Sequence, residues 1–206
     1  KLSLKNPRRI AIDNRADVSS TLEQEFVRIR GRNEVWREGV LMSLVTRTFT
    51  EQVIIFVNRK DTARRLVILF KVKKLKVSEL HGNLTQAQRL SELKKFTVGK
   101  TNYMICTDVA ARGLDIKNVK TVINFEMPTE LKTYIHRVGR TARAGQAGTS
   151  VSLTGEEDRL ILKQIVKRAK ANGESIKHRV IPNETILYWT QKIEAMAKQI
   201  KEIETS

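Results

Sequence analysis

The sequence predicts an α/β domain in which helices cover both faces of a parallel β-sheet, and three observations lead to this fold class. Short apolar runs alternate with segments of helical periodicity from about residue 26 to residue 153, the pattern of strands joined by crossover helices. One of these runs, VIIFV at 53–57, is apolar throughout, as expected of a strand buried on both faces, and YMICT at 103–107 is a second, largely apolar run. With 206 residues, of which 40% are hydrophobic, the chain is also long enough to bury such a core.

Each element has its own sequence signal. Strands are predicted where apolar residues run together or alternate, at residues 26–29, 53–57, 75–80, 103–107, 121–125 and 149–153. A helix should follow the second strand, because apolar residues recur at helical spacing at Ala63, Leu66, Val67 and Phe70. Another helix should run from the capping-box pair Thr85 and Gln88 to about Phe96. A third should begin at Pro128 and continue through His136.

The character of the sequence changes after Gly155. A charged amphipathic helix is predicted over residues 156–171 and a second helix over 184–203, after an interruption at Pro182. The second helix carries an apolar seam formed by Ile186, Ile193, Met196 and Ile200. This seam is expected to pack on the domain itself or to stay solvated, and the alternative is a surface that binds a partner.

Three regions follow from these patterns. Residues 1–20 are polar and irregular, with Pro7 before the paired Arg8 and Arg9, and are expected to be a linker that arrives from an upstream domain. The α/β domain should occupy residues 21–155. Residues 156–206 should form a C-terminal helical extension.

The chain is strongly basic. Lys and Arg number 39 against 22 Asp and Glu, a formal net charge of +17. The excess is +3 over residues 1–30 (7 basic, 4 acidic), +12 over 31–155 (22 basic, 10 acidic) and +2 over 156–206 (10 basic, 8 acidic). It therefore belongs to the predicted domain, and a basic folded surface indicates a polyanionic partner, with RNA or DNA ahead of an acidic membrane.

Other classes of protein are disfavoured. No run of about 18 apolar residues and no signal peptide is found in the sequence, so no membrane partner is predicted. Cys106 is the single cysteine, which rules out an internal disulfide and indicates a reducing compartment. Because it lies inside an apolar run, it is expected to be a buried strand residue and not a nucleophile.

The first chemical motif is HRVGRTARAG, residues 136–145. Arg137, Arg140 and Arg143 recur at intervals of three, and a turn at Gly139 would let Arg140 and Arg143 converge on one point. Two guanidinium groups held together suit bidentate contact with phosphate oxygens. The alternative is a solvated basic helix end, and pairing of these arginines with the chain's own acids would count against the phosphate hypothesis.

Two further motifs follow predicted strands. In TDVAARGLD, residues 107–115, Thr107 could donate to a phosphate, Gly113 permits close backbone approach and Asp115 could accept from a ribose hydroxyl. The alternative is an ordinary turn capped by Asp108. In ELHGNLTQAQR, residues 79–89, Gly82 and the helix start behind it could hold a backbone phosphate.

Together with VIIFVNRK, these motifs resemble the second RecA-like domain of DEAD-box RNA helicases in order and in separation. The resemblance covers residues 22–155 and implies a RecA-like parallel sheet. The tail, with KHRVIP and ETILYWTQKIEAMAK, is similar to the nucleolar subgroup that assembles the large ribosomal subunit. That likeness implies a nuclear, nucleolar location and pre-ribosomal protein partners.

The resemblance implies a role for each matching residue. Arg140 and Arg143 would be arginine fingers on the γ-phosphate of ATP, and His136 would couple hydrolysis to RNA binding. Asp115 would hold the ribose, with Gly113 beside it. Arg112 and Arg137 would face the N-terminal RecA-like domain of the same protein. RNA backbone contacts are expected from Thr107, Gly82, Arg89, Asn58, Arg59 and Gln86.

The sequence also departs from a complete enzyme. Ala142 stands where the family has glycine, and no Walker loop, DEAD run or Ser-Ala-Thr is found. The GKT at residues 99–101 precedes a strand, and position 94 is Lys instead of Gly. Mg²⁺ would therefore be held by the missing domain, and the fragment alone should hydrolyse ATP poorly. The alternatives are a basic RecA-like module that binds RNA or protein without an ATPase role, and a related enzyme that acts on DNA.

Overall fold

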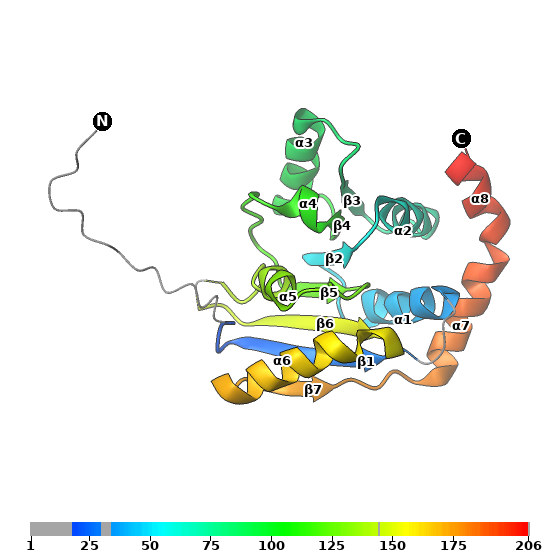
Figure 1. Ribbon diagram of the computed structural model, residues 1–206. Helices are drawn as coiled ribbons and strands as arrows, with labels where there is room; N and C mark the ends of the chain where they lie inside the picture. The colour runs from blue at the N-terminus through cyan, green and yellow to red at the C-terminus, as the bar shows by residue number, and fades with distance from the viewer. Residues whose placement is uncertain (1–17, 30–33, 144, 206) are drawn as a thin grey trace, which may run out of the picture.

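In the computed structural model, residues 18–29, 34–143 and 145–205 are described. Across them, seven strands form one parallel sheet with the order β3-β4-β2-β5-β6-β1-β7 (Figure 1). The strands are β1 (Leu22–Arg28), β2 (Val53–Val57), β3 (Val77–Leu80), β4 (Tyr103–Thr107), β5 (Thr121–Asn124), β6 (Gly148–Thr154) and β7 (Ile176–His178). Because every pair is parallel, the carboxyl ends of all strands lie at one edge.

The central strands are apolar because both of their faces are covered. In β2, Val53, Ile55 and Val57 belong to one core cluster, while Ile54 and Phe56 belong to another. Residues that alternate along a strand point to opposite faces. Each such side chain contributes about 1.5–3 kcal/mol when it is fully buried.

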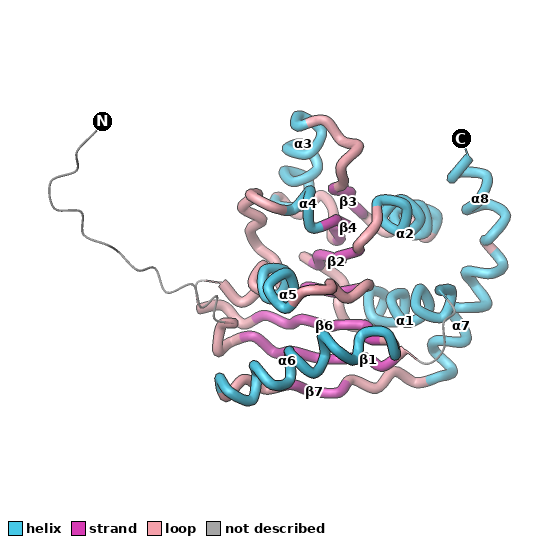
Figure 2. Tube along the Cα trace, in the orientation of Figure 1, coloured by secondary structure: helices cyan, strands magenta, loops and turns pink. Residues whose placement is uncertain are grey.

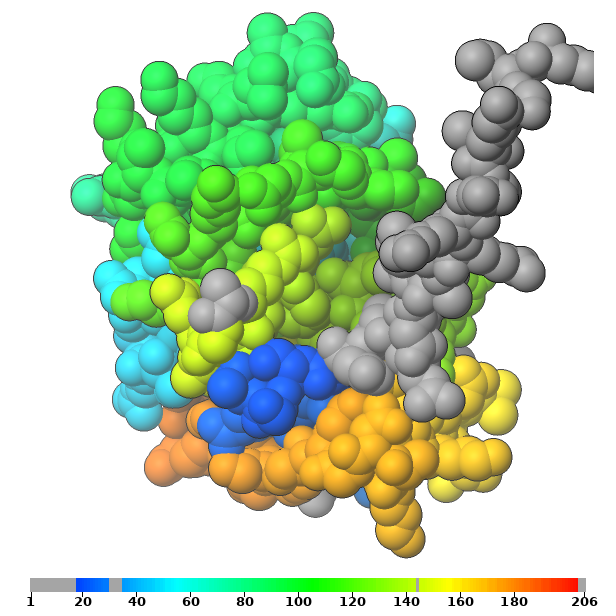
Figure 3. Space-filling model, turned by 90° about the vertical axis from the view of Figure 1, so that its left-hand side faces the viewer, coloured from blue at the N-terminus to red at the C-terminus, as the bar shows by residue number. Residues whose placement is uncertain are grey.

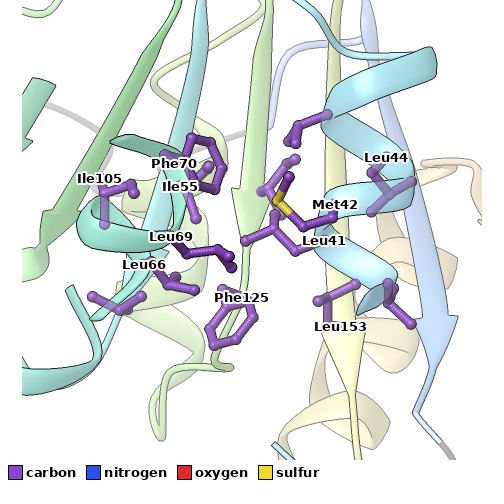
Figure 4. Close-up of a cluster of buried hydrophobic side chains, with 14 of the residues drawn as sticks. Leu41, Met42, Leu44, Ile55, Leu66, Leu69, Phe70, Ile105, Phe125 and Leu153 are labelled. Atoms are coloured by element: carbon purple, nitrogen blue, oxygen red, sulfur yellow. The ribbon is translucent and has the colours of Figure 1, made fainter. Parts of the chain in front are cut away.

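One face of the sheet is covered by helices from both ends of the chain. They are α1 (Glu34–Arg47), α2 (Lys60–Val72), α7 (Asn183–Ala195) and α8 (Ala197–Thr205). Figure 4 shows Leu41, Met42 and Leu44 of α1 and Leu66, Leu69 and Phe70 of α2 meeting side chains of the strands. This layer forms the largest core of the domain.

The other face carries the helices between the remaining strands, and Figure 2 shows helices on both sides of the sheet. They are α3 (Gln86–Thr97), α4 (Asp108–Ala111), α5 (Leu131–Val138) and α6 (Arg159–Asn172), the last preceded by the 3-10 turn η1 (Glu156–Asp158). Phe96 of α3 packs beside β2–β4, while Tyr134 of α5 and Ile161 of α6 pack beside β1. The predicted fold class, a parallel sheet with helices on both faces, is confirmed.

Local predictions hold best where a motif is explicit. In α3 the Thr85 hydroxyl accepts from the Gln88 amide at 3.3 Å, and the Gln88 side chain accepts from the Thr85 amide at 2.8 Å. This is the predicted capping box. The helix predicted from Pro128 begins later, at Leu131, and the sequence patterns did not predict α1, α4 or β7.

The C-terminal extension is part of the same core. β7 pairs with β1, and Ile186, Ile193 and Ile200 are buried in the α1/α2 cluster. At the contact of α1 with α7, a Cβ on Gly39 would lie 2.8 Å from Thr190 Oγ1, so the absence of a side chain there lets the helices approach closely. The seam therefore packs on its own domain. The linker predicted over 1–20 lies almost entirely outside the described residues.

Candidate functional site

Arg137 fixes α5 to the carboxyl ends of three strands. Its side chain is 1% exposed, and Nε and Nη2 bind the two oxygens of Asp108 at 2.8 and 2.7 Å. Nη1 donates to the Glu126 carbonyl at 2.7 Å and to Asn124 Oδ1 at 3.3 Å, and Nη2 also donates to Asn58 Oδ1 at 2.7 Å. These five bonds use all five N–H donors of the guanidinium.

This arrangement corrects one expectation from the sequence. Arg137 has no donor left for another domain, and its buried position gives it an internal role. Asn58 was expected to contact RNA; its amide oxygen accepts from Arg137 and its amide nitrogen donates to the Met127 carbonyl at 2.9 Å, while the residue stays exposed. Its contact with RNA remains a prediction.

A pocket lies between α4 and α5, and Arg137 forms part of its wall. Basic residues dominate its lining, and Asp108 is the one acid among them. The lining residues are Phe56, Asp108, Ala111, Arg112, Thr133, His136, Arg137 and Arg140. Since Arg137 already satisfies Asp108, the charges of Arg112 and Arg140 make the pocket suited to an anion.

Arg140 and Arg143 both contact the loop after α4; Figure 3 shows the green segment that holds this loop beside the yellow-green segment that holds the arginine motif. Arg140 Nη1 donates to the Leu114 carbonyl at 2.7 Å, and Arg143 Nη1 lies 3.6 Å from Asp115 Oδ1. Burial lowers the pKa of Arg140 below its ordinary value, and the nearby charge of Arg143 lowers it further. An anion placed between the two guanidinium groups would relieve both effects.

The contact of Arg143 with Asp115 is the kind of pairing that would count against the phosphate hypothesis. The side chains are 47% and 67% exposed, and Asp115 also lies 3.5 Å from Lys117. Exposed pairs of this length contribute little. A phosphate can therefore replace the carboxylate at Arg143, and Asp115 remains accessible to a hydroxyl.

The sharp bend of the arginine motif is not where the sequence suggested. Gly139 has φ −68°, a value that any residue adopts. Ala142 has φ 54°, so the left-handed residue is the one at which the family has glycine. Gly113 also has φ 76°, and a Cβ there would meet nothing, so this backbone is open to a ligand.

The residues expected to contact RNA follow three adjacent strands. Asn58 and Arg59 follow β2, Gly82 and the start of α3 follow β3, and Thr107 ends β4. Gly82 and Gln86 are exposed, whereas Thr107 is 9% exposed. The fold therefore brings this set to one edge of the sheet.

Two polar atoms at that edge lack a partner. His81 Nδ1 and Arg89 Nε are buried and form no hydrogen bond with any described part of the chain. Buried polar atoms are normally satisfied. A water molecule or a polar ligand would complete the hydrogen bonding of these two atoms.

Sequence reasoning missed several parts of the site. Asp108 was weighed only as a helix cap, yet it is the bidentate partner of Arg137, and Phe56 lies 5.2 Å below the guanidinium. An acid at the end of a buried strand was the available signal for Asp108. Phe56 and Asn124 gave none, because their positions in the sequence fit an ordinary strand.

The remaining expectations concern Cys106 and membranes. Cys106 is buried in β4, and burial raises the pKa of its thiol far above the ordinary range, which confirms a buried strand residue with low reactivity. Among the described residues, no helix has the length and apolar character needed to cross a membrane.

Comparison with known proteins gives a consistent result. Residues 36–145 match the family model of the helicase conserved C-terminal domain. The chain is 50% identical over 199 residues to DEAD-box ATP-dependent RNA helicase 28 of Arabidopsis thaliana, which covers 97% of this chain and 25% of that protein. It is 52% identical over 199 residues to probable ATP-dependent RNA helicase DDX27 of Homo sapiens, with 97% and 26% covered. The chain thus spans about a quarter of the length of these relatives.

Solved structures agree with this match. The Escherichia coli DEAD-box protein SrmB, bound to regulator of ribonuclease activity A, superposes with TM-score 0.69 at 34% identity, over 80% of this chain and 93% of that one. Dbp5 of Saccharomyces cerevisiae, bound to RNA and ADP BeF3, superposes with TM-score 0.69 at 28% identity, over 91% of this chain and 47% of that one. The RecA-like fold expected from the motifs is confirmed.

Proposed function

Because this chain belongs to the DEAD-box family, as its conserved C-terminal helicase domain, we propose that it is the second half of an ATP-dependent RNA helicase. In this proposal it supplies arginine fingers and part of the RNA-binding surface, and the N-terminal RecA-like domain supplies the rest. The observation that carries the proposal is the basic pocket between α4 and α5, whose one acid is already bound by Arg137.

Each residue of the site then has a task. Arg140 and Arg143 stabilise the negative charge that develops on a transferred phosphoryl group, and Arg137 sets their position by fixing α5. His136, exposed at the mouth of the pocket, carries the signal between bound RNA and the nucleotide. Arg112, exposed after α4, contacts the N-terminal domain.

The chain's residues fit ATP as a ligand shared between two domains. Bound ATP supplies the phosphoryl group that is transferred to water, with Mg²⁺ held by the N-terminal domain. Arg140 and Arg143 suit its γ-phosphate, and Asp115 with the open backbone at Gly113 suits its ribose. Positioned charges of this kind act in a site from which water is excluded, and closing the two domains provides that exclusion.

RNA lies along the carboxyl edge of β2, β3 and β4 in this proposal. Gly82, Arg89 and Thr107 contact its phosphates, with Arg59 and Gln86 beside them. The unsatisfied atoms of His81 and Arg89 support a polar ligand there. Contacts to the backbone and to 2′-hydroxyl groups give little sequence preference.

The test is made in a protein that contains both RecA-like domains. Arg143→Ala should lower the RNA-stimulated ATPase rate by about 10³-fold or more, the range for arginine fingers in related enzymes, while RNA affinity stays unchanged. The matched control is Arg64→Ala, on the exposed surface of α2, which should keep the full rate.

An unchanged ATPase rate in Arg143→Ala would remove the finger assignment. It would favour the second candidate function, a basic RecA-like module that binds RNA or protein without an ATPase role. A binding module has no use for two phosphate-directed arginines beside Asp115, and this favours the helicase.

We also propose that the whole protein acts in the nucleolus, in assembly of the large ribosomal subunit, with pre-ribosomal proteins as partners. The support is the similarity of the tail to that subgroup, together with the 97% of the chain aligned to the DDX27 relative. Fluorescent tagging should place the protein in nucleoli, and its depletion should lower the yield of large subunits. A diffuse cytoplasmic signal would contradict this assignment.

A further inference from the structure

A ladder of cations and aromatic rings lies on the face of the sheet opposite the α4/α5 pocket. Lys73 Nζ lies 5.3 Å from the centre of the Trp189 ring, and Lys192 Nζ lies 5.6 Å from the centre of the Tyr188 ring. The Trp189 and Tyr188 rings pack edge to face, with their centres 5.4 Å apart. The ladder thus joins the end of α2 to the exposed side of α7, which Figure 1 places on the far side of the molecule from α4 and α5.

Part of this ladder is open to solvent. Tyr188 is 53% exposed, and the neighbouring Leu187 is 47% exposed. Tyr188 and Leu187 together leave apolar area uncovered beside the lysines. Because Lys192 lies over the Tyr188 ring, a second flat ring would stack there in its place.

The ladder continues into a row of lysines along the amino edge of the sheet. Lys74, Lys76 and Lys100 are exposed there and form no salt bridge with any described residue. Lysines at the end of α2 also suit the helix dipole, but Lys76 and Lys100 lie outside that helix. Lys76 directly precedes β3, and Lys100 lies in the turn that leads into β4. The charge is therefore a property of the edge.

Hydrogen bonds hold the loops of this edge side by side. The Asn102 amide donates to the Lys76 carbonyl at 2.8 Å, and the Val53 amide donates to the Asn102 carbonyl at 3.0 Å. The proposed RNA path lies at the other ends of the same strands. A strand of five residues such as β4 separates the two edges by about 17 Å.

We propose that this amino-edge surface, formed by Lys74, Lys76, Lys100 and the Lys73–Trp189–Tyr188–Lys192 ladder, is a second binding site for single-stranded RNA. A base stacks on Tyr188, and the lysines contact the phosphates on either side of it. Stacking on aromatic rings combined with a row of cations is how proteins hold single strands without reading their sequence. An acidic peptide would use the lysines but would gain nothing from an exposed ring.

This site lies outside the assignment of Arg140 and Arg143, so the two proposals can fail separately. An RNA strand bound at both edges of the sheet would contact opposite sides of one domain, which enlarges the footprint of the helicase on its RNA. The amino-edge site needs neither ATP nor the other RecA-like domain.

The experiment uses this chain and a fluorescein-labelled oligouridine of about twelve nucleotides. Fluorescence anisotropy gives Kd from about 50 to 200 mM KCl. Lys74→Ala combined with Lys76→Ala should weaken binding and lower the slope of log K against log salt by about 1.4, since each lost phosphate contact on a single strand accounts for about 0.7. Tyr188→Ala should raise Kd about tenfold and leave the slope unchanged.

The matched control is Lys163→Ala combined with Lys167→Ala, an equal loss of charge on the exposed side of α6. It should change neither Kd nor slope, and circular dichroism should show that every variant is folded. As a second measurement, 4-thiouridine in the same oligonucleotide should crosslink to the peptide that contains Tyr188 and Trp189.

The inference is overturned if the lysine and tyrosine variants bind like the control, if crosslinks fall only near Gly82 and Arg89, or if polyglutamate displaces the probe as well as unlabelled oligouridine does. In the first two cases the carboxyl edge is the whole RNA site and the proposed helicase function is untouched. Loss of affinity in the tyrosine variant, with full ATPase activity retained by a two-domain protein that carries it, supports the second site.

Discussion

Replacing Arg137 with methionine should destabilise the domain more than any exposed arginine change. The substitution keeps the apolar stem above Phe56 but removes the five hydrogen bonds of the guanidinium. Breaking a buried ion pair from one side costs about 3–5 kcal/mol. Asp108 is 29% exposed, so water recovers part of that cost, and the low end applies. The orphaned acceptors on Asn58, Asn124 and Glu126 add about 1 kcal/mol in total after partial rehydration.

The expected loss is therefore about 4 kcal/mol of unfolding free energy. For a chain of this length, that corresponds to a fall in Tm of roughly 8–16 °C, measured by circular dichroism. Urea denaturation, followed through the fluorescence of Trp36 and Trp189, should give the same ranking. Arg64→Met, on the exposed side of α2, serves as the matched control and should leave Tm nearly unchanged.

A double-mutant cycle separates the ion pair from the rest. Arg137→Met with Asp108→Asn should be more stable than the sum of the two single changes predicts, because no uncompensated carboxylate is left. If Arg137→Met lowered Tm no more than the control did, Arg137 could not be the anchor of α5. The explanation of how Arg140 is positioned would then be wrong.

Three further changes test other parts of the fold. Gly39→Val should lower the unfolding free energy by about 2 kcal/mol and alter tryptophan fluorescence, because the valine side chain would collide with α7. Unchanged stability would mean that α7 can move away freely. Thr85→Ala should cost about 1 kcal/mol and speed amide exchange at the start of α3, because it removes the capping box with Gln88, whereas uniform exchange would argue against a local cap. Tyr103→Phe should cost about 1 kcal/mol at pH 7 by losing the bond to the Val45 carbonyl. Burial raises the pKa of Tyr103 from 10.0 to about 12, so its contribution to stability is complete below pH 10 and is lost as the pH rises toward 12. The difference in unfolding free energy between the two proteins should therefore shrink above pH 10. A difference that stays constant with pH would contradict this.

The fold could be predicted where sequence and environment correspond one to one. The apolar runs at 53–57 and 103–107 match β2 and β4 in every residue, since only a strand buried on both faces tolerates them. α1 escaped prediction because five of its residues between Val40 and Val45 are buried and apolar, which hides the helical period. β7 escaped because its three residues, IKH, carry no apolar pattern, and its place depends on pairing with β1.

The candidate site was predictable in its members but not in their roles. The spacing of three identified Arg137, Arg140 and Arg143 as one motif. It could not show that Arg137 is buried with all its donors used while Arg143 is exposed. That difference arises from Asp108 and Asn124, which approach through the tertiary fold. The same holds for Ala142, whose backbone is left-handed and lies so close to Gly148 that a Cβ there would come within 2.5 Å of the Ala142 amide nitrogen.

The position of β1 has a consequence for how the chain folds during synthesis. β1 pairs with β6 and β7, so Leu22 cannot pair before Gly148 has been synthesised, and Gln24 cannot pair with Ile176 before that residue has been synthesised. More than half of the chain must leave the ribosome before the first strand finds a neighbour, and contacts so distant in sequence form slowly. Until then, the backbone edge of β1 stays open to pairing with other chains. Nascent chains of this protein should therefore need chaperone protection over that interval. They should need it for a longer time than the nascent chains of a domain whose first two strands pair with each other.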